Sequence, residues 1–193
     1  MTAAPNQPTI REPTIRDSTA ADIGAILAIY AHHVEHGVAS FELTPPDVAE
    51  MTRRRDAALA AGLPYLVAEV GGAVAGFACA APYRGRPAYR HTLETTVYVA
   101  PASLGRGVGR ALLGALIGRC EDLGYRQLIA VIGDSANAPS IKLHEALGFD
   151  RAGLLRAVGF KHGRWLDSVI LQRGLGDGDT TPPRASARPA ASG

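Results

Sequence analysis

The stretch that decides the fold is Thr92-Leu-Glu-Thr-Thr-Val-Tyr-Val-Ala-Pro-Ala-Ser-Leu-Gly-Arg-Gly-Val-Gly109. Its first half is rich in β-branched and aromatic residues, which favour a strand, and Pro101 ends that strand. Three glycines follow, and strong helix-forming residues begin at Arg110. A glycine-rich turn at a helix N-terminus exposes backbone N–H groups that can bind phosphate. Such glycines more often form only a tight turn, so the choice between a phosphate-binding loop and a simple turn depends on the rest of the chain.

The composition is that of a globular protein with no unusual partner. The chain has 193 residues, of which 47% are hydrophobic and 20% charged, and its net charge is +2. Scattered arginines argue against a nucleic-acid partner, and the absence of a run of about 18 apolar residues argues against a membrane span. The first residues lack a signal-peptide pattern. We therefore predict a cytoplasmic protein.

The cysteines and histidines do not form a metal motif. Cys79 and Cys120 have no metal-type spacing, and we predict that both are reduced and mostly buried. His32 and His36 are four residues apart, but Glu35 is displaced from a His-Glu-x-x-His pattern. A polar helix end is the better interpretation, so no metal site is predicted.

Hydrophobic periodicity and turn residues predict the order β-α-α-β-β-β-α-β-α-β-β. The two strands on either side of the third helix are parallel if that helix is a crossover connection. The result is an α/β (α+β) mixed sheet with helices on both faces, and not a doubly wound dinucleotide fold. The predicted strands are 13–17, 65–70, 73–80, 92–99, 125–132, 149–160 and 164–173, and the predicted helices are 19–36, 44–61, 107–123 and 138–147.

One domain, residues 13–175, is predicted between two disordered tails, residues 1–12 and 176–193, which are rich in Pro, Ala, Gly and polar residues. The segment Pro8–Arg11 is repeated as Pro13–Arg16, and only one copy can be the first strand. We choose the second copy, because residues 17–19 can cap the helix that follows. The run Arg53–Arg55 is interpreted as a solvated helix face.

Two ionisable residues suit acid–base chemistry. Glu94 has apolar neighbours, which raise the pKa of a carboxyl and suit a general base, although a surface glutamate at a strand end fits equally well. His144 is more simply a partly buried helix residue, and becomes an acid or base only if the central strand faces it. Arg84 and Arg86 flank a glycine in a loop and suit an anionic substrate, with solvent exposure as the alternative.

The element order and several motifs resemble the GNAT superfamily of acetyl-CoA-dependent N-acetyltransferases. More narrowly, they are similar to the phosphinothricin and methionine-sulfoximine acetyltransferase group. The similarity covers about residues 14–175, and its matching stretches are Tyr83-Arg84-x-Arg86-x-Ala88-Tyr89, Thr92-x-Glu94-x-x-Val97-Tyr98-Val99, Gly105-Arg106-Gly107-Val108-Gly109, Val131-Ile132-Gly133-Asp134-x-x-Asn137, Leu143-His144-Glu145-Ala146-Leu147-Gly148-Phe149 and Gly159-Phe160-Lys161-x-Gly163-Arg164-Trp165-x-Asp167.

The resemblance implies that Glu94 is the general base, acting through water, and that a backbone amide near Val99 holds the oxyanion. His144 is either the acid for the leaving thiolate or a member of the base network. Leu104 departs from the family loop, which usually begins with Gln or Arg. The implied cofactor-binding residues are Val97, Tyr98, Val99, Gly105, Arg106, Gly107, Val108, Gly109, Arg110 and Asn137, and the implied substrate-binding residues are Arg84, Arg86, Tyr89, Glu94, Thr95 and Thr96.

The expected function is therefore transfer of an acetyl group from acetyl-CoA to the primary amine of a small amino-acid-like acid. Phosphinothricin, methionine sulfoximine and methionine sulfone are the expected acceptors, and the resemblance implies a homodimer. The alternatives are acetylation of protein N-termini or of another small amine, and a non-catalytic protein that binds CoA.

Overall fold

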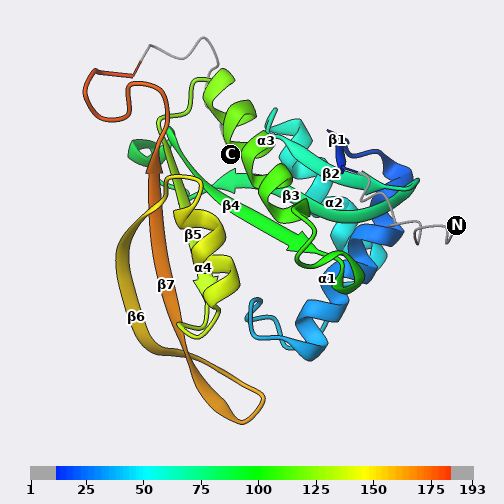
Figure 1. Cartoon of the computed structure of the whole chain (residues 1–193). Helices are drawn as coiled ribbons and strands as arrows, with labels where there is room; N and C mark the ends of the chain where they lie inside the picture. Colours follow the sequence, from blue (N-terminus) through cyan, green and yellow to red (C-terminus); the bar gives the residue numbers. More distant parts are fainter. Residues whose placement is uncertain (1–11, 184–193) are drawn as a thin grey trace, which may run out of the picture.

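The computed structural model describes residues 12–183, which form one mixed sheet with helices on both faces (Figure 1). The predicted order of strands and long helices is confirmed. The strands are β1 (Thr14–Asp17), β2 (Tyr65–Val70), β3 (Ala73–Pro82), β4 (Thr92–Val99), β5 (Gln127–Gly133), β6 (Asp150–Lys161) and β7 (Arg164–Gly174), and the helices are α1 (Ile23–His36), α2 (Val48–Ala60), α3 (Val108–Asp122) and α4 (Ala138–Glu145).

The strands lie in the order β1-β2-β3-β4-β5-β7-β6, and β4 and β5 form a parallel pair, as predicted from the crossover helix. Side chains alternate between the two faces. In β2, Leu66 packs in a core with α3, whereas Val67 packs in a second core with α1 and α2. The fully buried Leu112 and Ile26 belong to these two cores, respectively.

The parallel pair separates half-way along β4. Residues Thr92–Thr95 pair with Gln127–Ala130, but the ladder between the two strands ends there. Beyond that point β4 pairs with β3 on one side, and β5 pairs with β7 on the other. The resulting gap between β4 and β5 is the feature of the fold that positions the site.

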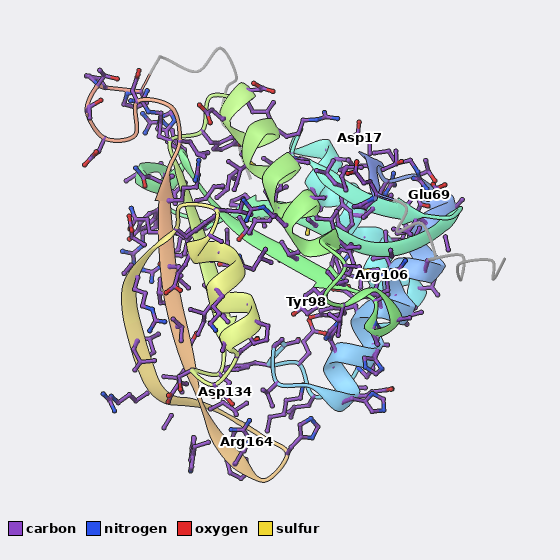
Figure 2. All side chains as sticks on the ribbon, in the orientation of Figure 1. Asp17, Glu69, Tyr98, Arg106, Asp134 and Arg164 are labelled. Atoms are coloured by element: carbon purple, nitrogen blue, oxygen red, sulfur yellow. The ribbon has the colours of Figure 1, made fainter. Side chains whose placement is uncertain are left out.

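The hairpin of β6 and β7 is joined to the body of the molecule near its tip. Lys161 is buried, and its Nζ donates to the carbonyl oxygen of Ser40 in the connection between α1 and α2 (2.8 Å). Arg164 forms an ion pair with Asp134 in the loop after β5, and both residues are marked in Figure 2. The first contact holds the α1–α2 connection against the hairpin, and the second holds the loop after β5 against it.

Three details differ from the sequence predictions. Helix α2 begins at Val48, because the Asp47 side chain accepts from the N–H of Glu50 (2.7 Å), so the two prolines precede the helix and do not occupy its first turn. Arg55 is buried and bonds to Ser18, so the predicted solvated face does not include it.

The C-terminal segment is the third difference. Residues 176–181 form turns and a bend, and Arg126 donates to the carbonyl oxygens of Gly178 (2.8 Å) and Thr181 (2.9 Å). This part of the predicted tail is therefore structured. The predictions for residues 1–11, including the first Pro-Thr-Ile-Arg copy, and for residues 184–193 lie outside the described residues. Across residues 12–183, no helix has the length and apolar character needed to cross a membrane.

Candidate active site

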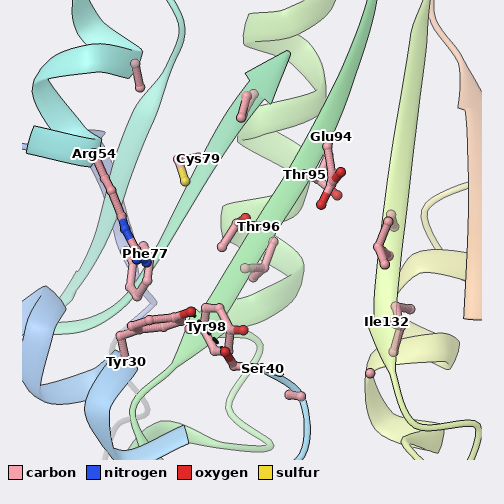
Figure 3. Close-up of a pocket in the computed structure, with 18 of the residues that line it drawn as sticks. Tyr30, Ser40, Arg54, Phe77, Cys79, Glu94, Thr95, Thr96, Tyr98 and Ile132 are labelled. Carbon is pink, nitrogen blue, oxygen red and sulfur yellow. Dashed lines mark hydrogen bonds between the residues drawn. The ribbon is translucent and has the colours of Figure 1, made fainter. Parts of the chain in front are cut away.

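A cavity of about 860 Å³ lies where the face of the sheet covered by α1 and α2 meets the gap between β4 and β5 (Figure 3). Its floor is formed by side chains of β3 and β4, and its walls by α2, the α1–α2 connection, the end of β5 and the start of α4. Glu94 and His144, which come from different elements, both line it.

Glu94 reaches this cavity because of its register in β4. It pairs with Ala81 of β3 and Ile129 of β5, and it alternates with Leu93, which is 1% exposed in the core under α3. Burial raises the pKa of the Glu94 carboxyl above its usual 4.5. The expected shift is therefore present, and its cause is desolvation.

His144 is buried in α4, with its ring edge-on to Phe149. Its Nδ1 lies 2.8 Å from the carbonyl oxygen of Ser140. Because a carbonyl can only accept, Nδ1 carries the proton and Nε2 of the neutral ring has a free lone pair. Burial lowers the pKa of His144, although the bond to Ser140 opposes this shift. The ring is therefore neutral near pH 7.

The edge of β4 beyond the split exposes main-chain groups to the gap. The N–H of Ala100 donates to the carbonyl oxygen of Ala75 (2.8 Å), which places Ala100 in a hydrogen-bonded pair with β3. Since such pairs alternate along an antiparallel ladder, the N–H and C=O groups of Val97 and Val99 point away from β3, toward the gap. The Val99 carbonyl accepts from Nε2 of His33 (2.8 Å).

The glycine loop directly follows this edge. Gly105 and Gly107 have φ values of 72° and 79°, which favour glycine, and Gly107 precedes the first residue of α3. Val108 is buried in the core, whereas Arg106 and Arg110 are exposed. Figure 2 shows Tyr98 on β4 and Arg106 in the loop after it. The free N–H groups of the first turn of α3 therefore lie next to the gap.

Comparison with known proteins agrees with this geometry. Residues 28–149 match the acetyltransferase (GNAT) family. A phosphinothricin N-acetyltransferase of Alcaligenes faecalis is 57% identical over 170 residues, which cover 88% of this chain and 86% of the relative. The chain belongs to the GNAT acetyltransferase family. The resemblance found in the sequence motifs and the expected N-acetyltransferase class are thereby confirmed.

Two further GNAT relatives narrow the group. An L-methionine sulfoximine/L-methionine sulfone acetyltransferase of Salmonella typhimurium is 40% identical over 159 residues, covering 82% of this chain and 92% of the relative. The crystal structure of a phosphinothricin acetyltransferase from Sinorhizobium meliloti in complex with AcCoA has a TM-score of 0.86 and is 50% identical, covering 89% of this chain and 92% of that one. The GNAT fold expected for this chain is thus confirmed.

The structure brings together only part of the predicted site. Glu94, Thr95, Thr96, Val97, Tyr98, Asn137 and His144 line the cavity. The Oδ1 of Asn137 accepts from the N–H of Ser140 (3.3 Å) at the start of α4. Val99 and the loop Gly105–Arg110 lie outside the lining and continue the edge of β4.

The predicted substrate loop is not part of this cavity. Arg84 is exposed, and its guanidinium stacks on the rings of Tyr83 (5.0 Å) and Tyr89 (5.6 Å). Arg86 is also exposed, and neither arginine lines the cavity within the described chain. Among residues 12–183, no group of three or more His, Cys, Asp or Glu side chains is placed to hold a metal ion.

Sequence reasoning missed the cavity wall formed by α2 and the α1–α2 connection. Arg54, Glu42 and Ser40 line the cavity, and the hydroxyls of Tyr30 and Ser40 are 2.9 Å apart inside it. A signal was available, because Met51, Arg54 and Ala58 have the spacing of one helical face. The prediction of a solvated face treats Arg53–Arg55 alike and does not depend on this spacing.

Proposed function

We propose that this GNAT protein acetylates the primary amine of a small amino-acid-like acceptor of the phosphinothricin, methionine sulfoximine or methionine sulfone type, with acetyl-CoA as donor. The observation that carries the proposal is the presence of Glu94 and His144 in one cavity, at the open edge of β4. The relatives that are 57% and 40% identical support the class of acceptor.

In the proposed reaction Glu94 acts as general base, through a water molecule, and removes a proton from the acceptor's ammonium group. The raised pKa of its carboxyl supports this role, since a base is most effective when its pKa approaches the working pH. The neutral amine then attacks the thioester carbonyl directly, forming the C–N bond, and the C–S bond breaks as the thiolate leaves. The attacking nitrogen gives up its second proton to solvent, and the thiolate takes up one proton from solvent to leave as the free thiol of CoA. The N–H of Val99 is proposed to hold the developing oxyanion.

The cosubstrate is proposed to lie along the edge of β4. The main-chain groups of Val97 and Val99 face the gap, as a pantetheine arm that pairs like a strand would require. We assign the diphosphate to Gly105–Arg110, where the first turn of α3 offers free N–H groups. The Asn137 side chain donates to the carbonyl oxygen of Gly133 and accepts from the N–H of Ser140, and these two hydrogen bonds fix its orientation beside the same gap. Leu104 is exposed beside this loop and offers no polar group.

For His144, the hydrogen bond to Ser140 favours one of the two roles implied by the resemblance. A neutral ring that already donates through Nδ1 can accept a proton at Nε2 but cannot donate one there. This supports a place in the base network with Glu94, and argues against a resting acid for the thiolate. A pH profile of the His144→Gln variant tests this assignment, because removal of a base shifts the acidic limb of kcat/KM.

The remaining assignments are also proposals. Thr95 and Thr96 line the cavity near Glu94, whereas binding of the acceptor by Arg84, Arg86 and Tyr89 rests on the resemblance alone. A homodimer is supported by a group of exposed apolar side chains on the β6–β7 hairpin: Leu154, Leu155, Val158, Phe160 and Trp165. Light scattering of the purified protein measures this directly. The cytoplasmic location and the absence of a metal cofactor stay predictions.

The deciding experiment measures thiol release from acetyl-CoA in the presence of phosphinothricin, methionine sulfoximine, methionine sulfone, polyamines or N-terminal peptides. We expect the highest kcat/KM with one of the first three. Turnover restricted to peptides or polyamines would instead support the alternative acetyltransferases. Binding of CoA without turnover on any amine would support a non-catalytic protein.

A further inference from the structure

The acceptor side of the cavity contains a cation that the reaction described above does not use. We propose that the guanidinium of Arg54 binds the anionic end group of the acceptor side chain and so sets the preference for phosphinate over uncharged acceptors. This inference rests on the proposed function, because it concerns the acceptor of the same reaction.

Arg54 faces the same side of the sheet as the proposed base. Glu94 and Tyr98 alternate with the buried Leu93 and so lie on the face covered by α2, as do their β3 neighbours Ala81 and Phe77. Figure 3 shows the Arg54 side chain extending from α2 toward the part of the cavity that Phe77 and Tyr30 line, with Glu94 at the other end of the drawn cavity, and Arg54 lies near enough to Tyr30 to act on the pKa of its hydroxyl.

The spacing along the strand decides which part of an acceptor reaches Arg54. Glu94 and Tyr98, which lie opposite Ala81 and Phe77, are four residues apart, or about 13 Å at about 3.3 Å per residue. The acceptor's amine has to lie near Glu94, and its α-carboxylate is attached to the same carbon as that amine. Only the end of the acceptor's side chain extends far enough to approach the guanidinium.

The charges of the cavity favour the same assignment. Among the described residues that line it, Arg54 alone carries a fixed positive charge, whereas Glu42 and Glu94 are acidic. Burial lowers the pKa of His144, so this ring adds no positive charge near pH 7. An anionic group that enters the cavity is repelled by Glu94, and Arg54, which also holds Glu42, is the cation of this lining that can donate hydrogen bonds to the anion.

The guanidinium is oriented before a ligand arrives. Its Nε donates to Glu50 (2.6 Å) and its Nη1 to Glu42 (2.7 Å). Among the described residues, no hydrogen bond engages Nη2, which keeps two donors available. Glu50 also pairs with Arg53, so its charge is shared between the two arginines. A guanidinium fixed in this way loses little further freedom when it binds a phosphinate oxygen.

The test uses two acceptors that differ in charge but hardly in shape. Phosphinothricin ends in a methylphosphinate anion and methionine sulfone in an uncharged methyl sulfone, on side chains of equal length. In Arg54→Met we expect KM for phosphinothricin to rise at least tenfold more than KM for methionine sulfone. Arg54→Lys should restore part of the difference. The matched control is Arg119→Met, which removes an exposed arginine of α3 that pairs with Asp17 outside the cavity and should leave both KM values unchanged.

The outcomes separate this inference from the proposed function. An equal rise in both KM values would mean that Arg54 binds the α-carboxylate or only supports the wall, and it would overturn the inference alone. A wild-type protein that acetylated neither acceptor would overturn the proposed function and this inference with it. Unchanged thermal unfolding and an unchanged acetyl-CoA KM in Arg54→Met show that the comparison concerns the acceptor site.

Discussion

Replacement of Glu94 by Gln tests the proposed mechanism most directly, because it keeps the shape of the side chain and removes its basicity. A positioned general base contributes about 10²–10⁴-fold to a rate. At about 1.36 kcal/mol per tenfold, this is about 2.7–5.4 kcal/mol of the activation barrier. The other carboxylate in the cavity, Glu42, is held by Arg54 (2.7 Å) and cannot replace Glu94 as base. We therefore expect a loss near the middle of the range, about 10³-fold in kcat.

The assay compares wild type and Glu94→Gln over pH 5 to 9, with kcat from thiol release and the CoA affinity from calorimetry. Because burial raises the pKa of Glu94, wild-type kcat/KM should rise with pH through a value above 4.5. The variant should lose this limb. Its affinity for CoA should stay within about twofold, because the cosubstrate is assigned to main-chain groups of β4 and α3.

The stability of Glu94→Gln is a second readout, and it should not fall as the activity does. A carboxyl whose pKa is raised by folding binds its proton more tightly in the folded chain, so ionisation lowers the free energy of unfolding as the pH rises past the unfolded value. Glu94→Gln should therefore be at least as stable as wild type at pH 7, and should have no advantage below about pH 4. Equal activity of variant and wild type at saturating acceptor would refute the base role, whatever the stability.

Two further substitutions test an ion pair of the fold and the packing of the cavity wall. Asp22→Asn should lower the free energy of unfolding by about 2 kcal/mol in urea at pH 7, because the buried carboxylate pairs with Arg16 (2.7 Å). Hydrogen bonding to Arg16 holds the pKa of Asp22 well below its usual range. Wild type should therefore lose this stability progressively as the pH falls below about 4, and the difference in unfolding free energy between wild type and Asp22→Asn should shrink to zero. A difference that does not change with pH would contradict the pairing. Gly159→Ala would place a Cβ 2.5 Å from the Phe41 ring, so it should cost about 1–3 kcal/mol and raise the acceptor KM. Gly153→Ala, with open space at its Cβ, is the control, and equal effects of the two alanines would refute the packing argument.

The order of the elements was predictable because local signals determine it. Gly71 and Gly72 both have positive φ, and the strands they join pair directly from Val70 to Ala73, as the Gly-Gly turn predicts. Gly124, also at positive φ, follows α3 where its apolar periodicity ends. Backbone preference and side-chain period act over a few residues, so no knowledge of distant contacts is needed.

Predictions that depended on distant partners were less successful. The prolines before α2 are compatible with a helical first turn, but the Asp47 side chain caps the helix, which begins at Val48, four residues later than expected. Arg55 has the sequence context of a surface residue, yet it is buried, because its guanidinium donates hydrogen bonds to Ser18, 37 positions away. The segment after Leu175 has a composition typical of disorder, but Arg126 donates hydrogen bonds to it at Gly178 and Thr181.

The sequence by itself determined the family, the strand that carries Glu94 and the glycine loop beside it, because these are contiguous motifs. Only the tertiary structure decided that β4 and β5 separate after Thr95, because from there β4 continues its pairing with β3 whereas β5 continues its pairing with β7. The tertiary structure also decided which arginine lines the acceptor cavity. Arg84 and Arg86 lie outside it, and Arg54 lines it, because the orientation of α2 over the sheet is set by its apolar contacts and by no local pattern of charge.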